Sequence, residues 1–308
     1  MIVQTYEELN FYLEMYRDGE IDLLVIESRG GLGKSRLVED LMRKSRHIKV
    51  NSHITPLALY FLGYEYQDVP FIFDDTDSLL TNDLSISLLK MICETRPVKK
   101  ISWYSTYELL EKKGIPQTYE TKSKVCLLTN DFKVLTKKIS ALKDRAWYIQ
   151  FQPTDIEILN KINQIKGFVD VNLSNQEIEE VYSLIEKYSR FCNFSLRSYV
   201  KGIFLYKRCK KIGKKDWQEI LLKEMRVNPK LVLLGSLMKK YNSDKERIKD
   251  WEQQGFSRRS FYDYKTKFVQ KTQKVQECSP NTNTPLPKPT TTLPRIKKTD
   301  TPLHYQVK

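Results

Sequence analysis

The stretch Ile21-Asp22-Leu23-Leu24-Val25-Ile26-Glu27-Ser28-Arg29-Gly30-Gly31-Leu32-Gly33-Lys34-Ser35 decides the fold. Its apolar run over residues 21–27 is short and ends next to glycines, which predicts a buried strand. A helix is expected to begin at Lys34. The intervening segment fits the phosphate-binding pattern G-x-x-x-x-G-K-[ST] except at its first position, where Ser28 stands.

Each residue type in this loop has a chemical role in binding phosphate. The glycines let successive backbone N–H groups and the helix N-terminus point at phosphate oxygens. Lys34 is expected to reach the β and γ phosphates, and the Ser35 hydroxyl to ligate Mg²⁺. The pattern therefore predicts ATP and Mg²⁺ as cofactors, held by Gly30, Gly31, Leu32, Gly33, Lys34 and Ser35. The alternative is a glycine-rich turn into a helix with one exposed lysine.

A second apolar run, Phe71-Ile72-Phe73, ends in the adjacent carboxylates Asp74 and Asp75. Behind a phosphate loop, Asp74 is expected to hold Mg²⁺ through water. Asp75 is expected to polarise the attacking water, with Asp77 as a second candidate for that role. Taken alone, such a pair is typical of the cap between a strand and a turn.

Strand and helix patterns alternate through the first half of the chain. Further strands are expected at 101–105, 124–130 and 146–151, with helices at 56–65, 78–95 and 132–144, which predicts a three-layer α/β/α core around a parallel sheet. After Pro153 the pattern is helical, beginning with a capping box at Thr154 and Glu157. The expected domains are a nucleotide-binding core (1–153), a helical lid and linker (154–242), a basic helix-turn-helix-like module (243–271) and a disordered Pro/Thr-rich tail (272–308).

The order of these motifs over about residues 20–210 resembles the ATPase core of the AAA+ family, with 28–35 as Walker A and 71–75 as Walker B. The resemblance implies that Asn130 is the sensor 1 residue, Arg145 the arginine finger that reaches a neighbouring subunit, and Arg197 the sensor 2 arginine. It also implies a homo-oligomer with ATP at the subunit interfaces. Taken singly, each arginine is more often a surface or packing residue. The run from His53 to Arg145 is similar to uncharacterised ATPases of phages and plasmids, while the segment 107–123 reads as a partner-facing loop or a plain connector.

The net charge of +14 is concentrated in one part of the chain. Residues 201–308 hold 26 Lys and Arg against 10 Asp and Glu, a net charge of +16, whereas the other 26 Lys and Arg face 28 Asp and Glu, a net charge of −2. This asymmetry favours a polyanionic partner, although a solvated basic tail gives the same count.

Residues 243–271 have helix-turn-helix spacing, with Gly255 at the turn and a second helix from Ser257. In such a motif the second helix lies in the major groove. A small core of Trp251, Phe256 and Phe261 is expected. The expected DNA contacts are Arg258, Arg259, Tyr262, Lys265 and Lys267. The alternative is a basic helical hairpin that packs on the lid or on a partner.

The leading interpretation is an ATPase that acts on DNA or on a DNA-bound complex, as replication initiators, helicase loaders and transposition regulators do. A STAND-like signalling switch and a protein-remodelling AAA+ ATPase are the alternatives. The longest apolar stretch, 231–238, is too short to span a bilayer, and Glu7, Glu8 and Glu14 do not suit a signal peptide, so a cytoplasmic protein without membrane contact is expected. Five scattered cysteines and three histidines signal neither disulfides nor a zinc site.

Overall fold

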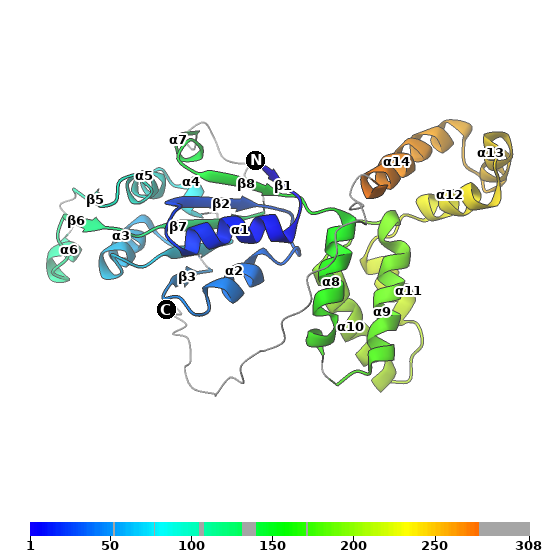
Figure 1. Cartoon of the computed structure of the whole chain (residues 1–308), viewed down its shortest axis with the longest axis horizontal. Coiled ribbons are helices and arrows are strands. Elements are labelled where there is room, and N and C mark those ends of the chain that lie inside the picture. The colour runs from blue at the N-terminus through cyan, green and yellow to red at the C-terminus, as the bar shows by residue number, and fades with distance from the viewer. Residues whose placement is uncertain (52, 77, 105–107, 131–139, 171, 277–308) are drawn as a thin grey trace, which may run out of the picture. The chain divides into compact units, whose positions relative to one another are not determined.

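The computed structural model describes residues 1–51, 53–76, 78–104, 108–130, 140–170 and 172–276 (Figure 1), all of which belong to one compact unit. The strands are β1 (Ile2–Val3), β2 (Leu23–Glu27), β3 (Ile48–Val50), β4 (Phe71–Asp74), β5 (Lys99–Ser102), β6 (Thr118–Thr121), β7 (Val125–Thr129) and β8 (Trp147–Phe151). The helices are α1 (Tyr6–Arg17), α2 (Lys34–Met42), α3 (Pro56–Glu65), α4 (Ser78–Thr81), α5 (Asp83–Ile92), α6 (Glu108–Lys112), α7 (Ser140–Lys143), α8 (Asp155–Val169), α9 (Asn175–Tyr188), the 3₁₀ turn η2 (Ser189–Phe191), α10 (Leu196–Lys211), α11 (Trp217–Glu224), α12 (Pro229–Lys240), α13 (Asp244–Gln253) and α14 (Arg258–Gln276).

Six strands form a parallel sheet in the order β1-β8-β2-β7-β4-β3. Alternate residues of each central strand face opposite sides: Leu24 and Ile26 pack with α1 and α2, whereas Leu23 and Val25 pack with α3, α4 and α5. Because both faces are covered by helices, the central strands β2, β4 and β7 are apolar except at their last residues, Glu27, Asp74 and Thr129. The predicted fold class, a three-layer α/β/α core followed by helices, is confirmed (Figure 1).

The sequence placed one strand in the wrong sheet and missed others. Of the run expected as a strand at 101–105, residues 101 and 102 belong to β5, which pairs antiparallel with β6 outside the parallel sheet. Its partner β6, together with α6, lies in the segment 107–123 that was expected to be a loop or connector. A short apolar run does not specify its partner, and β1 and β3 are too short, and too little buried, to give a clear apolar signal. Asp77, most of the helix expected at 132–144 and the tail beyond residue 276 lie outside the described residues.

The second half of the chain is helical, and its helices begin at identifiable caps. Thr154 accepts a hydrogen bond from the Glu157 backbone at the start of α8, but the Glu157 carboxylate accepts from the Tyr6 backbone N–H instead of closing the predicted capping box. Ser174 and Glu177 do form a complete box at α9. Helices α8 to α11 share the apolar core that covers one face of the sheet.

The last three helices have a core of their own, in which Trp251 and Phe261 are fully buried and Phe256 is partly buried. Helix α12, which the sequence groups with the lid, packs on α13 and α14 through Leu234 and Leu237. The Phe191 ring of η2 stacks on Phe268 of α14, with ring centroids 6.4 Å apart. The 3₁₀ turn therefore touches the basic module directly.

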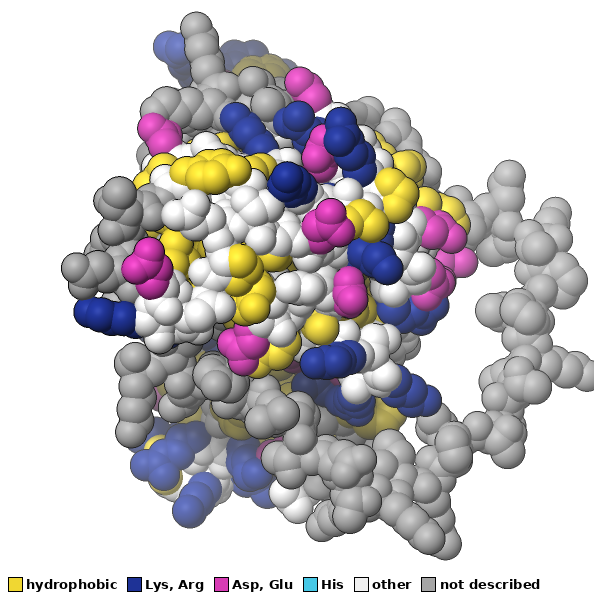
Figure 2. Space-filling view, turned by 90° about the vertical axis from the view of Figure 1, so that its left-hand side faces the viewer, with side chains coloured by type: hydrophobic (Ala, Val, Ile, Leu, Met, Phe, Trp, Pro, Cys, Tyr) yellow, Lys and Arg dark blue, Asp and Glu magenta, His cyan; other side chains and the backbone are white. Residues whose placement is uncertain are grey.

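Figure 2 views the end of the molecule that carries α3, α6 and the β5–β6 pair. On the coloured part of this face, basic and acidic side chains are interspersed with separate hydrophobic side chains. Across the described ranges, no helix combines the length and apolar character needed to cross a bilayer.

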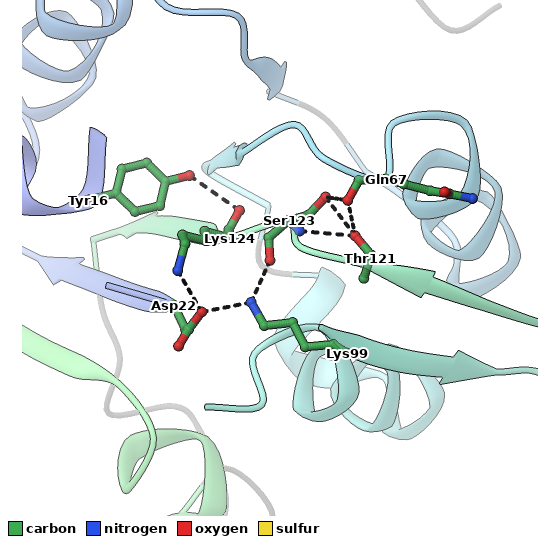
Figure 3. A network of polar contacts seen from close by, with 7 residues as sticks. All are labelled: Tyr16, Asp22, Gln67, Lys99, Thr121, Ser123 and Lys124. Atoms are coloured by element: carbon green, nitrogen blue, oxygen red, sulfur yellow. Dashed lines mark hydrogen bonds and ion pairs between the residues drawn. The ribbon is translucent and has the colours of Figure 1, made fainter. Parts of the chain in front are cut away.

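A buried ion pair ties the β5–β6 pair to the strand that carries the phosphate loop (Figure 3). The Lys99 side chain is 1% exposed, and its ammonium donates to Asp22 Oδ1 at 2.7 Å and to the Ser123 carbonyl at 2.9 Å. Lys124 donates to the same Asp22 oxygen at 2.9 Å. Burial acts to raise the pKa of Asp22, but the hydrogen bonds from the two lysines outweigh it and hold that pKa below its ordinary value of 3.8.

We expect Asp22→Asn to lower the free energy of unfolding by about 2–4 kcal/mol, because it leaves the buried Lys99 ammonium without its carboxylate. Lys124→Met should cost less than about 1 kcal/mol, because Asp22 keeps Lys99. Urea unfolding at pH 7 measures both. Since the folded-state pKa of Asp22 is lowered, its contribution is present above about pH 4 and lost as the pH falls through the lowered value, so the difference between wild type and Asp22→Asn should shrink there. Equal losses for the two variants would show that Lys99 does not depend on Asp22.

Candidate nucleotide-binding site

Strand order brings the predicted loops together at one edge of the sheet. β7 lies between β2 and β4, so the carboxyl ends of the three strands are adjacent. The Ser28 N–H donates to the Thr129 carbonyl at 3.2 Å and the Asp75 N–H to the Leu128 carbonyl at 3.3 Å. The loop after β2, the acidic pair at the end of β4 and Asn130 after β7 consequently lie at the same edge.

The loop leads into α2 through two glycines in the left-handed region, Gly31 with φ 85° and Gly33 with φ 83°. A residue with a β-carbon rarely adopts this conformation, so the backbone requires glycine at both positions. Ser35 follows in the first turn of α2 and is partly buried. This is the strand–loop–helix arrangement that the sequence predicts.

Lys34 is a buried cation that bonds only neutral acceptors. Its ammonium donates to the Ser28 carbonyl at 2.6 Å and to Asn130 Oδ1 at 3.0 Å. Among the described residues, no carboxylate lies within salt-bridge distance of it. Burial lowers the pKa of Lys34, against the opposing charges of Asp75, Asp74 and Glu27. An anion bound here would replace these neutral acceptors with a charged one, which makes an ion pair with the ammonium.

Asn130 links Lys34 to Asp75. Its Oδ1 accepts from the Lys34 ammonium, and its Nδ2 donates to Asp75 Oδ1 at 2.9 Å. Because an ammonium only donates and a carboxylate only accepts, these two neighbours fix the orientation of the amide. The predicted sensor residue thus lies between the predicted phosphate-binding lysine and the predicted base.

Asp75 stands in the left-handed region with φ 51°, and its side chain is exposed. Aspartate tolerates this conformation better than most residues with a β-carbon, but it remains uncommon. Such conformations cluster at functional sites, where they aim a side chain. Here the backbone turns Asp75 toward Asn130, while the preceding Asp74 is buried.

The oxygen donors suit Mg²⁺. Mg²⁺ keeps several waters and usually takes one or two protein oxygens in addition to phosphate oxygens, so the Ser35 hydroxyl and the Asp74 carboxylate are a sufficient protein set. The Asp74 carboxylate lies 3.2 Å from the Lys49 ammonium, which also bonds Glu39. Lys49 thereby holds Asp74 in place and offsets part of its charge.

The start of α10 lies against the phosphate loop. A β-carbon on Gly31 would meet Ser195 Oγ at 2.8 Å and the Arg197 Cβ at 3.3 Å, and one on Gly33 would meet Leu196 at 2.9 Å. The Arg29 guanidinium donates to the Phe194 carbonyl at 2.8 Å. The structure therefore brings Arg197, which is exposed, next to a loop that lies more than 160 residues earlier in the chain.

Arg145 lies at the other end of the strands. It comes two residues before Trp147, which pairs with Leu24, whereas the loop begins four residues after Leu24, or about 13 Å along the strand. Burial raises the pKa of the Cys93 thiol to about 12, and the charges of Lys99 and Arg145 act in the opposite direction, so Arg145 lies near that end of the sheet. The structure does not bring Arg145 to the phosphate loop of its own chain.

The expected DNA contacts lie on α14 and differ in their surroundings. Arg258, Arg259 and Tyr262 are exposed in its first two turns, and Lys267 is exposed with its ammonium 5.2 Å from the Tyr264 ring centroid. Lys265, by contrast, is bonded to the Asp244 carboxylate of α13. Trp251 Nε1 donates to Ser260 Oγ at 3.1 Å, which holds the turn between α13 and α14.

Two residues of this site were missed from the sequence. Lys49 contacts Asp74 because β3 lies beside β4, and strand order is not readable from local pattern. Arg29 belongs to the predicted loop, but the sequence does not indicate its hydrogen-bond acceptor. That acceptor, the Phe194 carbonyl, is far away in the chain and becomes a neighbour only in the folded structure.

No protein-family model matches the chain. It is 25% identical over 227 residues, covering 66% of this chain and 68% of the relative, to an uncharacterised 36.7 kDa protein from the nrdC-mobD intergenic region of Enterobacteria phage T4. Among solved structures, it is similar to domain III of the replication initiation protein DnaA from Thermotoga maritima, with 14% identity, a TM-score of 0.43, and coverage of 73% of this chain and 94% of that one. It is also similar to the Holliday junction branch migration motor RuvB of the same organism, with 12% identity, a TM-score of 0.46 and 77% of each chain covered.

We expect Gly31→Ala to destabilise the fold more than Gly213→Ala. Both glycines have positive φ, but a β-carbon on Gly213 meets nothing within 4 Å, whereas one on Gly31 clashes with Ser195. The left-handed strain alone should cost roughly 1–2 kcal/mol at Gly213, and the clash should add about 1–3 kcal/mol at Gly31. Urea unfolding of the two variants measures the difference. Equal losses would show that α10 does not press on the phosphate loop.

Proposed function

We propose that this protein is an AAA+-type ATPase that binds ATP with Mg²⁺ at the phosphate loop and acts on DNA through its basic C-terminal module. The observation that carries the ATPase proposal is the hydrogen-bonded series Lys34–Asn130–Asp75 at the end of three adjacent strands. It gathers a cation for phosphate, a polar side chain and a carboxylate at one edge of the sheet.

Each residue has a role in hydrolysis that follows from its position. Lys34 would exchange its bonds to Ser28 and Asn130 for the β and γ phosphates of bound ATP, where its charge stabilises the transition state. Asn130 would then be free to orient water, and Asp75 would polarise that water as a general base. Mg²⁺, when bound at Ser35 and Asp74, would neutralise charge on the phosphates.

In the proposed homo-oligomer, Arg145 would contact the γ phosphate bound to a neighbouring copy. Its own phosphate loop is at the opposite end of the strands, so a role for Arg145 at a γ phosphate requires the site of another copy. Arg197, beside its own loop, would act within its chain. ATP held between copies is therefore the arrangement in which both arginines have a phosphate to contact.

The DNA part of the proposal rests on the net charge of +16 beyond residue 200 and on the exposed side chains of α14. The first turn of α14 contains no acidic residue and begins with Arg258 and Arg259. The positive end of the helix dipole and two guanidinium groups thus coincide at an exposed site, which suits phosphate contacts. Lys265 would contact DNA only after leaving Asp244.

Lys34→Ala should abolish ATP binding, because the phosphates lose the buried cation of the loop. Asp75→Asn should keep binding and slow hydrolysis by about 10²–10⁴-fold, since asparagine tolerates the same backbone and still accepts from Asn130 but is no base. Fluorescent-nucleotide titration and a phosphate-release assay measure the two effects. Lys44→Ala, which removes an exposed cation just beyond α2, is the matched control and should change neither. ATP binding by Lys34→Ala at wild-type affinity would overturn the nucleotide assignment.

Arg258→Ala combined with Arg259→Ala should weaken duplex DNA binding and flatten the plot of log K against log salt by roughly one to two units, if both side chains contact phosphates. If they read bases, the slope should hold while discrimination between sequences falls. Fluorescence anisotropy at several salt concentrations separates the two. The control pair Lys214→Ala and Lys215→Ala removes the same charge from an exposed loop after α10 and should change the slope little. Unchanged affinity after removal of residues 243–308 would contradict the DNA role.

A further inference from the structure

A cavity of about 580 Å³ opens from the phosphate loop toward the helical half of the chain. It begins at Gly30, passes the start of α10 and ends at the turn between α11 and α12. Its walls are formed by Gly30, Phe191, Cys192, Asn193, Ser195, Arg197, Ser198, Lys201, Glu224, Met225, Arg226, Asn228 and Leu231. A volume of this size is in the range of ligand-binding pockets.

The cavity walls carry more positive than negative charge. Lys201 is paired with Glu224, so these two charges offset each other. Arg197 and Arg226 remain, and within the described part of the chain neither guanidinium makes a hydrogen bond or an ion pair. The hydrogen bond and charge of Lys201 lower the pKa of Glu224, and the charge of Arg226 acts in the same direction from a greater distance. Two unpaired guanidinium groups on one cavity suit an anion with several acceptor oxygens, such as a phosphate group.

Arg226 is held in an uncommon conformation, with φ 52°. The turn around it is fixed on both sides: the Arg226 N–H donates to the Lys223 carbonyl at 3.0 Å, and the Asn228 N–H donates to the Phe191 carbonyl at 3.0 Å. Asn228 also caps α12, ahead of Pro229. An arginine kept in the left-handed region by its neighbours, on the wall of a cavity, points to a functional side chain.

We propose that this cavity receives the terminal phosphate of the nucleotide bound at the phosphate loop, and that Arg226 binds it together with Arg197. The inference rests on the proposed function and adds a phosphate-binding residue from the turn between α11 and α12. The entrance at Gly30 favours the phosphate end of the ligand, because this glycine belongs to the loop expected to surround the phosphates. An uncharged base or sugar would leave the two guanidinium groups unpaired.

The test compares ATP with ADP, because only ATP carries the third phosphate. Arg226→Gln should weaken binding of fluorescent ATP in the presence of Mg²⁺ by about tenfold or more and leave ADP affinity within twofold of wild type. Arg226→Gly accepts φ 52° without strain and should give the same result, which separates loss of charge from damage to the turn. Arg208→Gln, an exposed cation on α10, is the control and should change neither affinity.

Equal weakening of ATP and ADP, or no weakening, would overturn the inference. So would unchanged nucleotide affinities with impaired self-association in sedimentation, because the cavity would then receive an acidic side chain of a second copy. Wild-type protein that binds neither nucleotide would overturn the proposed function itself, and this inference with it. If wild-type protein binds ATP but the Arg226 variants do not lose ATP affinity selectively over ADP affinity, the inference is overturned and the proposed function is not.

Discussion

The site depends on one buried cation. The Lys34 ammonium is removed from water and satisfied by a carbonyl and an amide oxygen, neither of which carries a formal charge. Burial without a counter-ion is unfavourable, so this arrangement stores electrostatic free energy that an anion recovers on binding. The other features of the site act on this lysine. The glycines of the loop leave room beside its ammonium, Asn130 accepts a hydrogen bond from it, and the charges of Asp74 and Asp75 act on it from a greater distance.

Much of the nucleotide site could be predicted because its chemistry is local. The phosphate loop, the strand ending in Asp74 and Asp75, and the helix from Pro56 to Glu65 each depend on neighbouring residues in the chain, and the structure has them where the sequence placed them. Strand pairing is not local. The run at 101–105 has the composition of a buried strand, yet the strand observed there, β5 (Lys99–Ser102), pairs with residues 118–121, and nothing in its own sequence specifies that partner. The contact of Lys49 with Asp74 could not be predicted either, because it depends on the pairing of β3 with β4.

The roles assigned to Asn130, Arg145 and Arg197 stay predictions, but the three residues differ in their distance from the phosphate loop. Asn130 is in contact with Lys34 and Asp75, and Arg197 lies at the helix that presses on the loop. Arg145 lies at the far end of the sheet from both. Among the proposed DNA contacts, Arg258 and Arg259 face solvent, whereas Lys265 is committed to Asp244. A residue's type and spacing suggested each role, but only the fold shows which side chains already have another partner.

The stacking of Phe191 on Phe268 makes one aromatic ring common to two regions. Phe191 lines the cavity beside the phosphate loop and also packs against the helix that carries Arg258 and Arg259. A β-carbon on Gly235 of α12 would lie 2.9 Å from the same ring, so the ring has little room to move independently. If a ligand in the cavity displaces Phe191, the stack with Phe268 must change as well, so α14 contributes to the free energy of that displacement. Thermodynamic reciprocity then requires that any polyanion which shifts α14 alter the affinity of the cavity by the same factor.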